Sequence, residues 1–169
     1  MNASMEDQAV NAESIAGQIA DVFASGGTLG SMHGYEDRDY EAVYALGHNL
    51  YAQGCYSDAL KAFAFLVMNN PFERRFVKAF ASCLQILKQY EDAIQFHSLT
   101  SVMDMTDPGP TFHTGECLVA LGRVPEAKDA FEIVLRQCKA PEQEALKQRA
   151  QALLDIINAA SPSDTKETK

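Results

Sequence analysis

The chain has 169 residues, of which 47% are hydrophobic, so it can bury a core as one folded domain. Its formal net charge is −9 and its pI is about 4.8. An acidic surface repels phosphate groups, and no apolar stretch approaches the roughly 18 residues that span a bilayer. Neither a nucleic acid nor a membrane is therefore expected as a partner.

The first 39 residues lie outside any internal repeat. Residues 1–10 are acidic and polar, are expected to be disordered, and lack the features of a signal peptide, which favours a cytoplasmic protein. The next part, 11–39, is expected to be an N-terminal helix followed by a linker ordered only by contact. The helix is predicted by apolar residues spaced three and four apart, namely Ile15, Ile19, Val22 and Phe23.

From residue 40 the sequence repeats every 34 residues. Residues of similar size recur at this step, in the sets Ala59, Ala93, Ala127; Gly47, Ala81, Gly115; and Phe63, His97, Phe131. A period of 34 with this content predicts tetratricopeptide repeats, each a helix–turn–helix unit. The expected fold is therefore all-α, with three tandem repeats at 40–73, 74–107 and 108–141.

A final helix is predicted over 142–158, with Leu146, Leu153 and Ile157 among its apolar residues. It should cap the exposed end of the third repeat, as a repeat array requires. Residues 159–169 are polar and are expected to form a disordered tail. Of the four cysteines, Cys55 lies near a turn and is expected to be the reactive one, while the others should be buried and reduced.

Catalytic and metal-binding motifs are missing from the sequence. There is no HExxH, GxSxG or Walker pattern, and no cysteine–histidine cluster has zinc spacing. His97 is interpreted as a core histidine in the place of a phenylalanine. We therefore expect no catalytic residue, no metal and no cofactor, and the protein is not expected to be an enzyme.

The periodicity favours a binding groove instead, because the first helix of each repeat should line the inner surface. Tyr44, His48 and Tyr51 share one helical face at i, i+4 and i+7, and the 34-residue step carries this face into the other repeats. The nine predicted groove residues are Tyr44, His48, Tyr51, Lys78, Ser82, Gln85, Phe112, Glu116 and Val119. Tyrosine is enriched in binding hot spots, and polar residues can hold an extended backbone. The alternative is a solvated inner face without a ligand.

Three further segments are more specific than the repeat. They are Ser25-Gly26-Gly27-Thr28-Leu29, the run Val43-Tyr44-Ala45-Leu46 with Tyr51, Gly54, Tyr56 and Ala59, and Phe112-His113-Thr114-Gly115-Glu116-Cys117-Leu118. Through these segments, and Met103-Asp104, the chain resembles the class II chaperones of bacterial type III secretion. That family includes SycD (also called LcrH), SicA, IpgC and PcrH.

The resemblance implies a cytoplasmic bacterial chaperone that binds an extended segment of a secreted client before export. The usual clients are hydrophobic, pore-forming translocators, and some members also act with a transcription activator. The resemblance assigns Tyr44, Tyr51 and Phe112 to pocket walls, with His48, Ser82, Gln85 and Glu116 as polar lining. It also implies a homodimer in the free form, with contacts from Ile15, Ile19, Val22 and Phe23.

One residue departs from the family pattern. Lys78 stands where the family commonly has an apolar groove residue, so either the matching pocket is altered or the client brings an acid or a polar backbone contact. Two alternatives for the partner also stay open: a secreted effector as the client, or another protein bound by a general tetratricopeptide-repeat adaptor.

Overall fold

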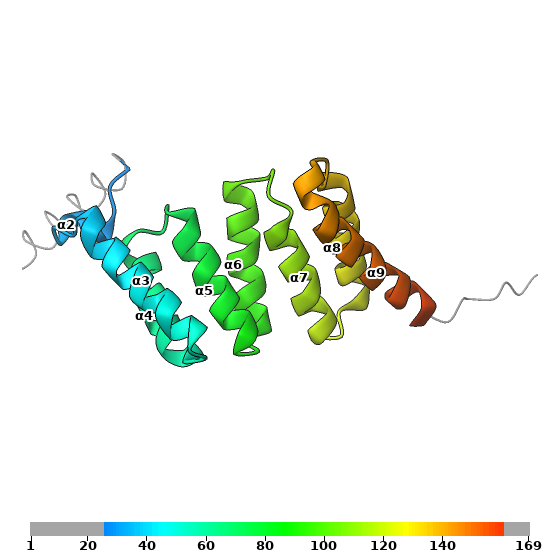
Figure 1. The fold of residues 1–169 in the computed structure, drawn as a ribbon, viewed down its shortest axis with the longest axis horizontal. Coiled ribbons are helices and arrows are strands. Elements are labelled where there is room, and N and C mark those ends of the chain that lie inside the picture. The colour runs from blue at the N-terminus through cyan, green and yellow to red at the C-terminus, as the bar shows by residue number, and fades with distance from the viewer. Residues whose placement is uncertain (1–25, 161–169) are drawn as a thin grey trace, which may run out of the picture.

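The computed structural model describes residues 26–160, which form helices and, within that range, no strand (Figure 1). A short helix, α2 (Leu29–Met32), precedes three helix pairs and a last helix, α9 (Glu144–Ala160), which follows a 3-10 turn (Pro141–Gln143). The pairs are α3 (Asp37–Ala52) with α4 (Tyr56–Asn69), α5 (Arg74–Ile86) with α6 (Tyr90–Met103), and α7 (Gly109–Ala120) with α8 (Val124–Gln137). They follow one another along the molecule from α2 to α9 (Figure 1).

The predicted all-α repeat fold is confirmed for this part of the chain. The first pair begins at Asp37, three residues before the expected start of the repeats, and α9 runs two residues beyond 158. None of the described helices is long and apolar enough to cross a membrane. The predicted N-terminal helix, with Ile15, Ile19, Val22 and Phe23, lies outside the described residues, as do 161–169.

Each pair depends on a close approach of its two helices. A Cβ atom added at Gly47 of α3 would lie 2.6 Å from the ring of Phe63 on α4. The third pair repeats this arrangement, with Gly115 on α7 and Phe131 on α8, at the same 2.6 Å. Real Cβ contacts are never so short, so the aromatic ring occupies the space that a side chain would need.

The second pair carries a different combination at these two positions. Ala81 replaces the glycine and His97 replaces the phenylalanine, and both are fully buried. The imidazole of His97 is smaller than the phenyl ring of a phenylalanine. The smaller ring is compatible with the methyl group that Ala81 adds on the facing helix. The interpretation of His97 as a core histidine is therefore confirmed.

The segment expected to be a linker instead contains α2. Thr28 and Ser31 form a capping box, in which each backbone N–H donates to the other hydroxyl at 3.1 and 3.0 Å. Gly30 is buried where a Cβ would lie 1.6 Å from the hydroxyl oxygen of Tyr40. The segment thus packs onto the first repeat because glycine permits this contact.

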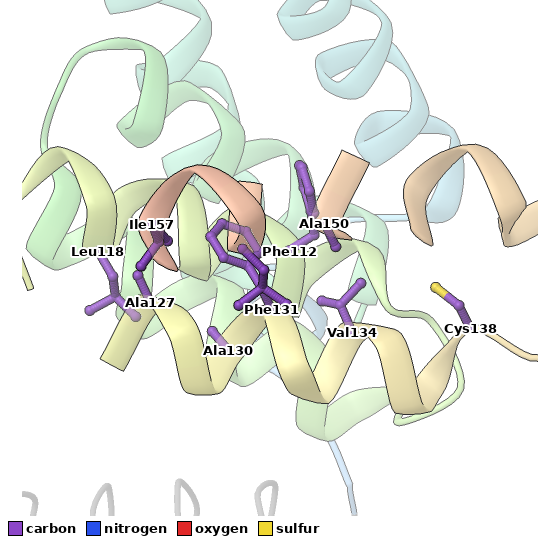
Figure 2. Packing of buried hydrophobic residues seen from close by; sticks show 10 residues of the cluster. Phe112, Leu118, Ala127, Ala130, Phe131, Val134, Cys138, Ala150 and Ile157 are labelled. Atoms are coloured by element: carbon purple, nitrogen blue, oxygen red, sulfur yellow. The ribbon is translucent and has the colours of Figure 1, made fainter. Parts of the chain in front are cut away.

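At the other end, α9 covers the third pair. Phe112 of α7 and Phe131 of α8 share a core with Ala150, Leu154 and Ile157 of α9. Figure 2 shows Phe112, Phe131 and Ile157 close together in this core. The predicted capping helix is therefore confirmed. Burial of its apolar face completes the array, because the last repeat would otherwise expose its core.

Candidate peptide-binding groove

The nine predicted groove residues lie on α3, α5 and α7, whose shared surface we call the inner face. A cavity of about 330 Å³ opens there, between α3 and α5, and we call it the inner-face cavity. Its lining residues are Tyr44, His48, Tyr51, Phe63, Arg75, Lys78, Ala79 and Ser82. Five of these belong to the predicted set.

Aromatic rings form one side of the cavity. The ring of His48 lies 4.5 Å from that of Tyr44 and 5.5 Å from that of Phe63, centre to centre, in edge-to-face contacts. Phe63 is almost fully buried and supplies apolar surface below the more exposed rings. The arrangement offers a surface with both aromatic rings and polar groups, which suits a ligand side chain of moderate size.

Two tyrosine hydroxyls at the cavity can donate a hydrogen bond to a ligand. Burial raises the pKa of both Tyr44 and Tyr51, so both stay protonated at neutral pH. Within residues 26–160, neither hydroxyl hydrogen-bonds to another protein group. Each is therefore available to an acceptor on a ligand.

Arg75 is a cavity residue that the sequence reasoning missed. It precedes Lys78 by three residues and so shares its helical face, and this spacing is the signal that could have identified it. Its guanidinium lies 5.1 Å from the centre of the Tyr44 ring. It is also paired with both carboxylate oxygens of Glu41, and with Glu73 at 3.3 Å. Two carboxylates and an aromatic ring therefore hold Arg75 in place.

Lys78 lies on the same wall of the cavity and is paired with the turn between α6 and α7. Its Nζ atom lies 3.0 Å from Oδ2 of Asp107. Burial alone raises the pKa of Asp107, but hydrogen bonds from Arg74, Lys78 and the backbone N–H of Gly109 lower it to about 2. Asp107 is therefore ionised at neutral pH.

Gln85 and Glu116 lie outside the cavity and contact each other. Gln85 donates to Glu116 at 3.0 Å and accepts a hydrogen bond from His97 Nε2 at 3.1 Å. Glu116 also accepts from His113 at 2.9 Å and from Arg149 of α9 at 3.2 Å. Burial raises the pKa of Glu116, but the hydrogen bonds from His113 and Gln85 outweigh it and lower the pKa. These side chains link helices α5, α6, α7 and α9.

Two predicted groove residues occupy other places. Phe112 is predicted as a pocket wall but does not line the inner-face cavity: it is fully buried beneath Arg149, whose guanidinium carbon lies 4.6 Å from the ring centre. The reason is that α9 packs over the part of α7 that the helical spacing assigns to the inner face. Val119 is 40% exposed near the end of α7 and does not line the cavity.

The cysteines follow the sequence prediction in their burial. Cys55 is exposed, whereas Cys83, Cys117 and Cys138 are buried. Burial raises the pKa of Cys83 to about 11 and that of Cys117 to about 12, so both are neutral thiols. Among residues 26–160, no three His, Cys, Asp or Glu side chains are placed to hold a metal ion.

Paired helices in tandem with a cavity on the inner face define a tetratricopeptide-repeat binding protein. The family profile described as tetratricopeptide repeat matches residues 76–107. The low calcium response locus protein H of Yersinia pseudotuberculosis is 32% identical over 136 residues, which cover 78% of this chain and 79% of that protein. The chain therefore belongs to the family of class II type III secretion chaperones to which that protein belongs.

Solved structures of the same family agree. The structure of PcrH, a Pseudomonas aeruginosa protein, in complex with the chaperone binding region of PopD has a TM-score of 0.71 and 35% identity, covering 75% of this chain and 96% of that chain. The type III secretion chaperone SycD of Yersinia enterocolitica, in complex with a peptide of the translocator YopD, has a TM-score of 0.70 and 31% identity, covering 73% and 95%. SycD has also been solved as an alternative dimer.

Proposed function

We propose that this protein is a cytoplasmic chaperone of a bacterial type III secretion system. It binds an extended segment of a hydrophobic translocator on its inner face and keeps that client soluble until export. The observation that carries the proposal is the inner-face cavity, with Tyr44, His48 and Tyr51 beside buried Phe63. Relatives with the same fold bind segments of PopD and YopD, which supports it.

The chemistry of the cavity suits such a client. An extended segment brings apolar side chains that need cover and backbone carbonyls that need donors. The aromatic rings supply the cover, and the hydroxyls of Tyr44 and Tyr51, which have no hydrogen-bond partner within residues 26–160, supply donors. A few anchors worth about 1–3 kcal/mol each, set against ordering costs, give binding that is firm yet reversible. Reversibility is required because the client must leave for the secretion channel.

An array of overlapping peptides from the secreted translocators of the same bacterium tests the proposal. The wild-type protein should bind one or a few adjacent peptides, and Tyr44→Ala should weaken that binding by about tenfold. Phe72→Ala is the matched control, since Phe72 is an exposed aromatic outside the cavity. It should bind like the wild type. Unchanged binding by Tyr44→Ala, with the fold intact by circular dichroism, would remove the cavity as the client site.

We also propose that the free chaperone forms a homodimer and that the protein acts by binding rather than by catalysis. The alternative dimer of SycD supports the first point. The predicted contacts remain Ile15, Ile19, Val22 and Phe23. Light scattering of Ile19→Asp against the wild type checks them, because a charge in an apolar dimer contact should shift the mass to that of a monomer.

A further inference from the structure

The inner-face cavity brings basic side chains together in an acidic protein. The sequence has 23 acidic and 14 basic residues, yet the lining of this cavity includes Arg75 and Lys78, and none of the described residues that line it is an aspartate or glutamate. In a protein of this composition, a wall with two cations is a local exception. Partners of complementary charge are favoured at such a surface.

The two cations differ in how firmly they are held. Arg75 is engaged by Glu41 and Glu73 and stacks on Tyr44, so its charge is already balanced by two carboxylates. Lys78 has one ionic partner among the described residues, Asp107, and its side chain is 43% exposed. Lys78 is therefore the cation that can turn toward a ligand.

Asp107 stays paired when Lys78 leaves it. Its Oδ2 atom lies 2.5 Å from Arg74 Nη2, and its Oδ1 atom accepts from the backbone N–H of Gly109 at 2.8 Å. Release of Lys78 thus leaves no unpaired buried carboxylate, which is the usual penalty for breaking such a contact. An ammonium group has three donor hydrogens, so Lys78 can also add an acceptor while it keeps Asp107.

The remaining lining sets where an acceptor would lie. Phe63 and Ala79 are apolar, while the hydroxyls of Tyr44 and Tyr51 and the ammonium of Lys78 are donors at the same cavity. An apolar side chain of the ligand fits against the apolar residues of the lining. An anionic oxygen next to that side chain can accept hydrogen bonds from the donors. A carboxylate gains more from an ammonium group than a neutral carbonyl does, because charge-assisted hydrogen bonds are stronger.

From these contacts we infer that the client segment in the inner-face cavity carries an aspartate or glutamate next to its apolar anchor, and that Lys78 selects for it. The inference rests on the proposed function, whose client class it narrows. Lys78 is then a specificity residue that rejects segments with a basic residue at that point.

The experiment is a selection from a library of random short peptides on the immobilised full-length protein. The wild type should enrich peptides with an acidic residue beside an apolar one, Lys78→Met should lose the acidic preference, and Lys78→Glu should replace it with a basic one. The matched control is Lys61→Met, which removes an exposed charge that is paired with Asp58 outside the cavity. Its selected peptides should match those of the wild type.

Affinities of one selected peptide and its Asp→Asn form then measure the effect. The wild type should prefer the acidic form by about fivefold, and Lys78→Met should bind both forms alike. Peptides that compete at the cavity but show no acidic preference would overturn the inference and leave the proposed function standing. If the selected peptides bind Tyr44→Ala as well as they bind the wild type, or if none is enriched, the proposed function falls with it.

Discussion

The guanidinium carbon of Arg149 lies 4.6 Å from the centre of the Phe112 ring, so α9 covers an aromatic side chain of α7. The same arginine pairs with Glu116 at 3.2 Å. Phe112 also packs against Phe131, with ring centres 5.6 Å apart. Two residues that the spacing assigns to the inner face therefore belong to the packing of the capping helix.

Phe112→Ala should accordingly destabilise the fold. Removal of a fully buried phenylalanine leaves a cavity and costs about 3–5 kcal/mol in the free energy of unfolding. Urea denaturation of the variant and the wild type measures this difference. Tyr44→Ala is the comparison, because Tyr44 is only half-buried and should cost less. A Phe112→Ala protein as stable as the wild type would contradict the burial described for this ring.

Gly47→Ala should also be destabilising, although alanine favours helices. The added methyl group would meet the Phe63 ring at 2.6 Å, and overpacking of this kind costs about 1–3 kcal/mol. A double-mutant cycle with Phe63→Leu checks the cause by thermal or urea unfolding. The smaller leucine should relieve the clash, so the double variant should lose less stability than the sum of the two single changes. Strictly additive losses would argue against the contact.

The stability of the protein should fall as the pH drops below about 6.5, through His97. Burial first, and then the neighbouring His113, lower the pKa of His97 from 6.5 to about 3. Between these values the unfolded chain binds a proton that the folded chain does not, so the stabilisation is complete above 6.5 and is lost toward pH 3. The slope approaches about 1.4 kcal/mol per pH unit.

Unfolding measured between about pH 7 and pH 5 isolates this effect, because the carboxyl groups with lowered pKa values respond only at lower pH. The matched variant combines His97→Phe with Ala81→Gly, which restores the residue pair of the first and third repeats. This variant should show a flatter pH profile over the same range. An equal slope in both proteins would mean that His97 is not the titrating group.

Lys88→Gly should stabilise the protein by about 1 kcal/mol. Lys88 has a φ of 61°, in the left-handed region, and occupies the turn position that Gly54 and Gly122 hold in the other repeats, with φ values of 78° and 72°. Its side chain is exposed, so little contact is lost. Thermal unfolding measures the gain. Gly54→Lys is the reverse test and should lower the stability by a similar amount, and a neutral result in both directions would contradict the argument.

The sequence by itself determined the repeat and its small residues. The 34-residue step located the helix pairs, because helix periodicity and tight helix contacts require particular residue types at particular spacings. It also brought Tyr44, His48 and Tyr51 to one face, where the structure has a cavity. Such features are local to one helix or one pair and need no knowledge of the rest of the chain.

Only the tertiary structure decided which of these residues face an opening. Phe112 lies under α9, and Lys78 meets Asp107 from the turn between α6 and α7. Both outcomes depend on how segments distant in sequence pack against one helix face. A spacing rule states which side chains share a face, but what covers that face is set by the shape and charge of the segments that pack onto it.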